Sequence, residues 1–91
     1  MSDRIARRVV VHGRVQGVFF RDSTQRKAQS RGVSGWVINR DDGAVEAHFE
    51  GDSDAVESMV AFAREGPRGA EVGRADVLDA EVEGLDGFEI R

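Results

Sequence analysis

The hydrophobic pattern of this 91-residue chain predicts an α+β sandwich in which two helices cover one face of an antiparallel sheet. Segments with the valine content or alternation of strands are interrupted twice by segments with the polarity or periodicity of helices. Between two of the strand-like segments lies Asp42-Gly43, a dipeptide that strongly favours a β-hairpin. The predicted order is strand, helix, strand, strand, helix, strand and a short terminal strand, which is the ferredoxin-like split β-α-β arrangement.

The first strand and the first helix are expected over residues 5–13 and 21–32. The strand carries aliphatic side chains in step on one face: Ile5, Val9 and Val11. The helix is expected to end at Gly32, because glycine commonly follows the last helical turn. Its apolar stripe is thin and consists of residues four apart: Phe20, Thr24 and Ala28.

Two further strands are expected over residues 35–41 and 44–50, one on each side of the hairpin turn. Apolar and polar residues alternate in the second of them. The apolar set is Val45, Ala47 and Phe49, and the polar set is Glu46, His48 and Glu50. This alternation predicts that one face of the strand is buried and the other faces solvent.

The second helix has the clearer pattern. Asp54 and Glu57 have the spacing of a capping box, and Gly66-Pro67 is a typical helix end. Between them, apolar residues follow the helical period: Val56, Met59, Val60 and Ala63. Residues 67–73 are then expected to form a loop, 74–82 a fourth strand and 88–90 a short last strand.

Composition limits the function classes. The net charge of −4 disfavours non-specific binding to nucleic acid or to anionic membranes. The absence of cysteine excludes disulfides, zinc knuckles and thiol nucleophiles. No apolar run is long enough to span a bilayer, and residues 1–4 lead into no signal-peptide pattern. We therefore expect one soluble cytoplasmic domain over residues 1–91, with residues 1–4 flexible and with no nucleic-acid or membrane partner.

The most informative segment is the predicted loop Gly13–Arg21 between the first strand and the first helix. Its two glycines, Gly13 and Gly17, allow a tight turn that exposes backbone N–H groups. Such a loop at the start of a helix forms a cradle for anions. Arg21 lies near the first turn of the helix, where the helix dipole disfavours a cation unless a bound anion reverses the local sign. The segment therefore predicts a phosphate-like ligand.

Two segments of the chain resemble the signature sequences of the acylphosphatases. They are the loop Gly13–Arg21, and Gly35–Asn39 together with Asp42–Glu46. This resemblance implies hydrolysis of the carboxyl–phosphate bond of small acyl phosphates by a monomer that needs neither metal nor cofactor. Asn39 would hold the attacking water. The phosphate would be bound by Arg21 and by the backbone amides of Val15, Gln16, Gly17, Val18, Phe19 and Phe20.

The physical chemistry of that reaction is compatible with these residue types. The leaving group is a carboxylate, so catalysis is mostly positioning and electrostatic stabilisation of the phosphoryl oxygens. An asparagine side chain can orient a water but is too weak a base to deprotonate it. The proton acceptor is therefore open, and the phosphate of the substrate is one candidate. Inorganic phosphate and sulfate are expected to compete with the substrate.

The main candidates also have purely structural interpretations. Arg21 could be a surface arginine paired with Asp22 or Gln25, and Asn39 could be a turn residue before the hairpin. The side chain of Gln16 could tie the loop to itself instead of binding a ligand. At the level of the whole chain, the alternatives are a non-enzymatic module that binds phosphate or a phosphorylated metabolite, and a small regulatory domain of a larger assembly.

Other residues with reactive or aromatic side chains give weaker evidence of function. His12 precedes the loop, but a strand histidine on a polar face is typically solvated, and His12 and His48 have no third metal ligand at suitable spacing. Neither Ser23 nor Thr24 has an obvious base nearby in the sequence. Stacking of RNA bases on Trp36 is disfavoured because the aromatic residues lie on different predicted elements and the net charge is negative.

Overall fold

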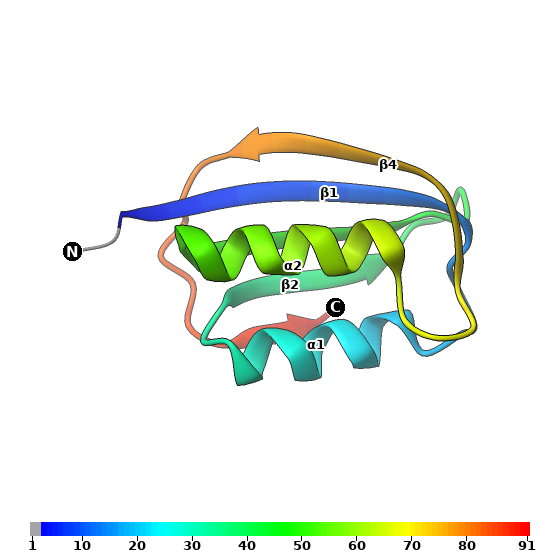
Figure 1. Ribbon diagram of the computed structural model, residues 1–91, viewed down its shortest axis with the longest axis horizontal. Helices are drawn as coiled ribbons and strands as arrows, with labels where there is room; N and C mark the ends of the chain where they lie inside the picture. Colours follow the sequence, from blue (N-terminus) through cyan, green and yellow to red (C-terminus); the bar gives the residue numbers. More distant parts are fainter. Residues whose placement is uncertain (1–2) are drawn as a thin grey trace.

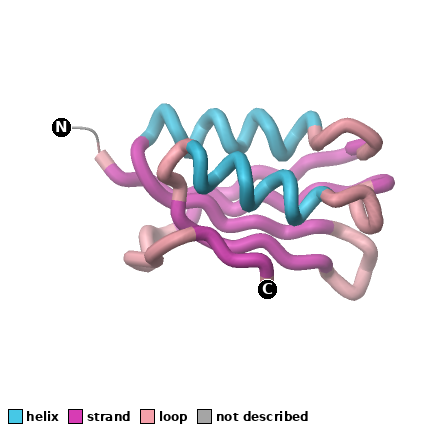
Figure 2. The backbone as a smooth tube through the Cα atoms, turned by 90° about the horizontal axis from the view of Figure 1, so that it is seen from below, coloured by secondary structure: helices cyan, strands magenta, loops and turns pink. Residues whose placement is uncertain are grey.

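The computed structural model describes residues 3–91 as two layers, with two helices packed on one face of a five-stranded sheet (Figures 1 and 2). This is the predicted α+β architecture. The elements in chain order are β1 (Arg4–Arg14), α1 (Phe20–Ser30), β2 (Ser34–Asn39), β3 (Val45–Asp52), α2 (Ser53–Glu65), β4 (Glu71–Ala80) and β5 (Phe88–Ile90). Within the described residues, no helix is long and apolar enough to cross a membrane.

We expect residues 1–4 to be flexible, and residues 1–2 of this segment lie outside the described residues. Arg4, which we expected to be flexible with them, is already the first residue of β1 and pairs with Asp52 of β3.

The strand order is β4-β1-β3-β2-β5, and its first four strands are antiparallel, as predicted. The terminal strand differs, because β5 pairs with β2 in parallel and makes the complete sheet mixed. After β4, the chain crosses from one edge of the sheet to the other at a single end and then turns back (Figure 1). Because β4 and β2 run in opposite directions, this reversal aligns β5 with β2.

The helices begin differently from the sequence prediction. Helix α2 starts at Ser53, so Asp54 and Glu57 lie inside it, and no side chain caps its first turn. Helix α1 starts at Phe20, and the residue before it, Phe19, has a left-handed backbone with φ of 59° and no capping bond. The start of α1 therefore has no side chain bonded to its first N–H groups.

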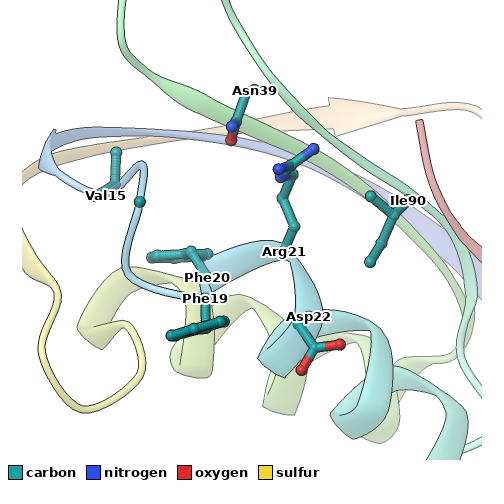
Figure 3. A pocket seen from close by; sticks show the side chains of 8 residues that line it. Val15, Phe19, Phe20, Arg21, Asp22, Asn39 and Ile90 are labelled. Carbon is teal, nitrogen blue, oxygen red and sulfur yellow. The ribbon is translucent and has the colours of Figure 1, made fainter.

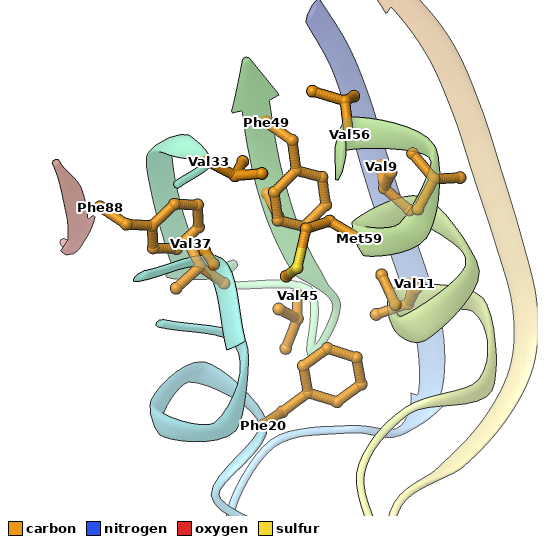
Figure 4. Close-up of a cluster of buried hydrophobic side chains, with 14 of the residues drawn as sticks. Val9, Val11, Phe20, Val33, Val37, Val45, Phe49, Val56, Met59 and Phe88 are labelled. Atoms are coloured by element: carbon orange, nitrogen blue, oxygen red, sulfur yellow. The ribbon is translucent and has the colours of Figure 1, made fainter. Parts of the chain in front are cut away.

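The hydrophobic core lies between the helices and the sheet (Figure 4). The predicted apolar stripe of α2 is confirmed, since all four of its members are buried: Val56, Met59, Val60 and Ala63. The rings of Phe49 and Phe88 stack with centroids 5.7 Å apart, which anchors the short β5 to the core. Thr24 fits its buried position on α1 because its hydroxyl donates to the carbonyl of Phe20 at 2.7 Å.

The expected solvent-facing side of β3 is wrong at two positions, because His48 and Glu50 are completely buried. The indole of Trp36 stacks on the His48 ring at 5.8 Å. The connection between β4 and β5 covers Glu50, whose carboxylate accepts the N–H groups of Glu83 and Leu85 at 2.8 and 2.6 Å. A third bond joins Glu50 to Nε2 of His48 at 2.9 Å. The alternation of apolar and polar residues in β3 cannot predict burial by a segment that lies more than 30 residues later in the chain.

These contacts make Glu50 a source of pH-dependent stability. Burial raises the pKa of the Glu50 carboxyl, but the backbone bonds from Glu83 and Leu85 and the contact with His48 more than offset it, so the pKa lies below its ordinary value of 4.5. A carboxyl with a lowered native pKa stabilises the fold above its unfolded-state pKa. That contribution is lost as the pH falls through the native pKa.

We expect Glu50→Gln to lower the free energy of unfolding at pH 7 by about 1–3 kcal/mol, because buried N–H groups lose a charged acceptor. The variant is also expected to lose less stability than the wild type when the pH is lowered from about 5 to about 3. Urea unfolding at several pH values measures both effects. Glu57→Gln, at an exposed glutamate of α2, is the matched control. An unchanged pH dependence in Glu50→Gln would show that Glu50 does not act as a native-state carboxylate.

Candidate active site

A break in the register of β1 lies just before the loop that connects β1 to α1. The pairing of β1 with β4 shifts between His12 and Gly13, and Gly13 has φ of 127°. A Cβ atom at Gly13 would lie 2.3 Å from the carbonyl oxygen of Glu71, so the close approach of the two strands requires glycine. Gly17 has open space around it but φ of 76°, so the turn of the loop itself requires a residue that tolerates this backbone.

This loop forms one wall of a pocket of about 290 Å³ (Figure 3). The other walls come from the first turn of α1, the end of β2 and the terminal strand β5. The lining residues are Val15, Gly17, Phe19, Phe20, Arg21, Asp22, Asn39 and Ile90. The pocket thus joins the two predicted signature segments, which are distant in the sequence.

Arg21 and Asn39 face the same space. The Arg21 guanidinium extends from α1 toward the end of β2, and the Asn39 amide points from β2 toward the loop (Figure 3). The carboxylate of Asp22 pairs with Arg26 one turn further along α1, not with Arg21. Among residues 3–91, no carboxylate forms an ion pair with Arg21. The alternative in which Arg21 is a surface arginine paired with Asp22 is therefore wrong.

Gln16 has a different environment from the other loop residues. Its side-chain amide donates to the carbonyl oxygens of Arg40 and Ala44 at 2.8 and 2.9 Å. The side chain therefore ties the loop to the β2–β3 hairpin. Neither the predicted tie within the loop nor the alternative of a ligand contact by this side chain includes that hairpin. Because Asn39 directly precedes Arg40, this tie fixes the loop relative to Asn39. These two bonds use both donor positions of the Gln16 side-chain amide.

The remaining loop residues divide between core and pocket. Val15 is completely buried, Phe20 is nearly so, and Val18 packs against the core. Neither Val18 nor Gln16 lines the pocket with the other predicted binding residues. Phe19, by contrast, is turned outward and is 80% exposed.

Two pocket residues were missed by sequence reasoning, namely Asp22 and Ile90. Ile90 could not have been found, because its position depends on the parallel pairing of β5 with β2, in which Ile90 lies opposite Val37. The side chain of Gln25 donates to the carbonyl of Phe88 at 3.0 Å and holds β5 against α1. The only indication in the sequence that Asp22 lines the pocket is its position directly after Arg21.

The two histidines lie in separate clusters. His12 is half-exposed with Nε2 3.4 Å from the carboxylate of Asp76, while His48 is buried against Glu50. The part of the chain that the structure describes contains no group of three or more residues suited to hold a metal ion.

Fold and pocket together define a class of protein. It is a small ferredoxin-like sandwich with a glycine-containing loop and an arginine at the first strand–helix junction, facing an asparagine on the neighbouring strand. A family model described as Acylphosphatase matches residues 7–90 of the chain. The chain therefore belongs to the acylphosphatase family, and it is a hydrolase of acyl phosphates.

Individual relatives agree with this assignment. An acylphosphatase from Natronomonas pharaonis is 53% identical over 91 residues, which cover 100% of this chain and 99% of the relative. The structure of an acylphosphatase from Coxiella burnetii matches with a TM-score of 0.92 and 35% identity, covering 98% of this chain and 94% of that one. The crystal structure of acylphosphatase from Bacillus subtilis matches with a TM-score of 0.90 and 40% identity, covering 96% of this chain and 98% of that one.

Proposed function

We propose that this protein cleaves the carboxyl–phosphate bond of small acyl phosphates by in-line attack of water on phosphorus. In this proposal Arg21 and the backbone amides of residues 15–20 bind the phosphate, and Asn39 holds the water. The observation that carries it is the convergence of the Arg21 and Asn39 side chains on one pocket beside the loop (Figure 3).

Phosphate binding is supported by the charge at this end of α1. The Arg21 guanidinium has no ion pair with Asp22, and its planar fork matches two phosphate oxygens. The uncapped start of α1 and the turn at Gly17 leave backbone N–H groups available to the remaining oxygens. An anion in this position would also relieve the repulsion between Arg21 and the positive end of the helix dipole. Inorganic phosphate and sulfate are therefore expected to compete with the substrate.

Water positioning is supported by the location of Asn39. The residue ends β2, where its amide is exposed and reaches the pocket without belonging to the core. Its side chain offers a carbonyl oxygen that can accept a hydrogen bond from water and an NH₂ group that can donate one. Both contacts would fix the water on one side of phosphorus. Because the amide is a weak base, we infer that the water proton passes to an oxygen of the substrate phosphate.

The choice of substrate follows from the leaving group. Cleavage of an acyl phosphate releases a carboxylate, which needs no proton from the enzyme at neutral pH. A phosphate monoester would release an alkoxide, and the proposed residues include no general acid to protonate it. Arg21 and the amides stabilise charge on the phosphoryl oxygens but do nothing for such a leaving group.

We expect hydrolysis of benzoyl phosphate to persist at full rate in excess EDTA, because Arg21 and the loop amides supply the positive charge that a metal would otherwise provide. An alkyl phosphate monoester such as glycerol 2-phosphate should be a poor substrate, because its leaving group is an alkoxide. A phosphate-release assay with and without the chelator measures both results. Loss of activity in EDTA that Mg²⁺ or Zn²⁺ restores would overturn the metal-free mechanism. Phosphate binding without any turnover would favour the binding-module alternative.

A further inference from the structure

Phe19 combines two unfavourable features at the edge of the pocket. Its side chain is 80% exposed, more than any other large hydrophobic residue in the described part of the chain. Its backbone φ of 59° is the only positive value among the non-glycine residues of the same part. Side chains with a Cβ disfavour this conformation. Backbone strain and exposed apolar surface at one residue both tend to mark ligand contacts.

Local packing does not account for the phenyl ring. Val18 and Phe20, on either side of Phe19, pack into or against the core and hold the loop in place. The ring of Phe19 contributes little to that packing because it is 80% exposed. A glycine at this position would form the same turn without strain and without exposing an apolar ring.

The direction of the proposed reaction gives the ring a role. In an in-line displacement the leaving group departs on the side of phosphorus opposite the attacking water. Figure 3 shows Asn39 and Phe19 at opposite ends of the pocket, with the Arg21 guanidinium beside Asn39. If Asn39 holds the water, the acyl group of the substrate extends from the phosphate toward the Phe19 ring.

Ile90 adds a second apolar surface at the pocket. It lines the pocket from β5 and is 38% exposed, so part of its side chain is free to contact a ligand. The parallel pairing of β5 with β2 and the bond from Gln25 hold it in place. An aromatic ring and a branched aliphatic side chain therefore border a site in which Arg21 and Asn39 are assigned to the phosphate and the water, while Asp22 pairs with Arg26.

We propose that Phe19 and Ile90 form an acyl subsite that selects acyl phosphates with an aromatic acyl group over those with a short aliphatic one. Phe19 is the specificity-determining residue, and its ring packs against the aromatic acyl group. Ile90 covers the edge of that group. This proposal rests on the proposed function, because it takes the position of the acyl group from the in-line attack.

The test compares benzoyl phosphate with acetyl phosphate. The measured quantity is the ratio of kcat/KM for the two substrates. Phe19→Gly should lower the benzoyl-to-acetyl ratio about 5- to 10-fold, in line with the size of an aromatic pair contact. Phe19→Leu, which keeps an apolar side chain, should lower it less, and Ile90→Ser should lower it about 2- to 5-fold. Val82→Ser, at an exposed valine of the β4–β5 connection, is the control and should leave the ratio unchanged.

A second readout separates selectivity from a structural role of Phe19. Because glycine tolerates the left-handed backbone, the melting temperature of Phe19→Gly should equal or exceed that of the wild type while the ratio falls. An unchanged ratio in a folded Phe19→Gly protein that hydrolyses both substrates would overturn the acyl subsite alone. Failure of the wild type to hydrolyse either substrate would instead overturn the proposed function.

Discussion

Replacement of Arg21 by glutamine is expected to lower kcat/KM for benzoyl phosphate by about 10³-fold or more, the scale of an arginine that stabilises a transferring phosphoryl group. In the proposed mechanism Arg21 is the only side-chain cation on the phosphate. Arg21→Lys should lose nearly as much, because an ammonium group cannot bind two phosphate oxygens in the geometry of the guanidinium fork. Both variants should also weaken inhibition by inorganic phosphate and sulfate.

The Arg21 variants should remain folded, because the guanidinium extends into the pocket and α1 is anchored by other buried residues, among them Phe20 and Ala28. Circular dichroism and urea unfolding check this. Arg31→Gln, at an exposed arginine beyond the other end of α1, is the control for the loss of one positive charge and should have normal turnover. Near-normal turnover in a folded Arg21→Gln protein would show that phosphate is not bound at this loop.

Asn39→Ala is expected to lower kcat by about 10²–10³-fold, the range found when one preorganised polar group of a catalytic site is removed. Its main contribution should appear in the transition state, because the water it holds becomes bonded to phosphorus only there. The free energy of unfolding should change by less than about 0.5 kcal/mol, since Asn39 is exposed. Steady-state kinetics and urea unfolding measure the two effects.

Asn39→Asp is the isosteric comparison for Asn39→Ala. It keeps the shape of the side chain but introduces a negative charge beside the bound phosphate. Both phosphate affinity and turnover should therefore fall. If Asn39→Ala raised KM with kcat intact, Asn39 would be a binding residue and another group would have to orient the water.

Local patterns in the sequence predict much of the fold and part of the candidate site. The period of Val56, Met59 and Val60 predicted the buried face of α2, since helical geometry alone places these residues together. Asp42-Gly43 predicted the hairpin that connects β2 and β3. Gly17 predicted the turn of the first loop, where its φ is 76°, whereas Gly13 lies within β1. Each of these features depends on residues close together in the chain.

The features that the sequence could not predict depend on distant contacts. Burial of His48 and Glu50 requires the β4–β5 connection to cross the sheet, and no residue near them signals that cover. The place of Ile90 in the pocket depends on the direction of β5, which three residues cannot specify. The bond from Gln16 to the hairpin likewise joins two elements whose relative position is set by the whole sheet.

In the proposed mechanism two residues have separate roles: Arg21 binds the phosphate, and Asn39 positions the water. Calorimetric titration of inorganic phosphate into the wild type, Arg21→Gln and Asn39→Ala, together with turnover of benzoyl phosphate by the same preparations, tests this division. We expect both variants to lose turnover, Arg21→Gln to lose phosphate binding, and Asn39→Ala to bind phosphate with an affinity close to that of the wild type. Equal loss of phosphate binding in the two variants, or retained binding in Arg21→Gln, would contradict this division.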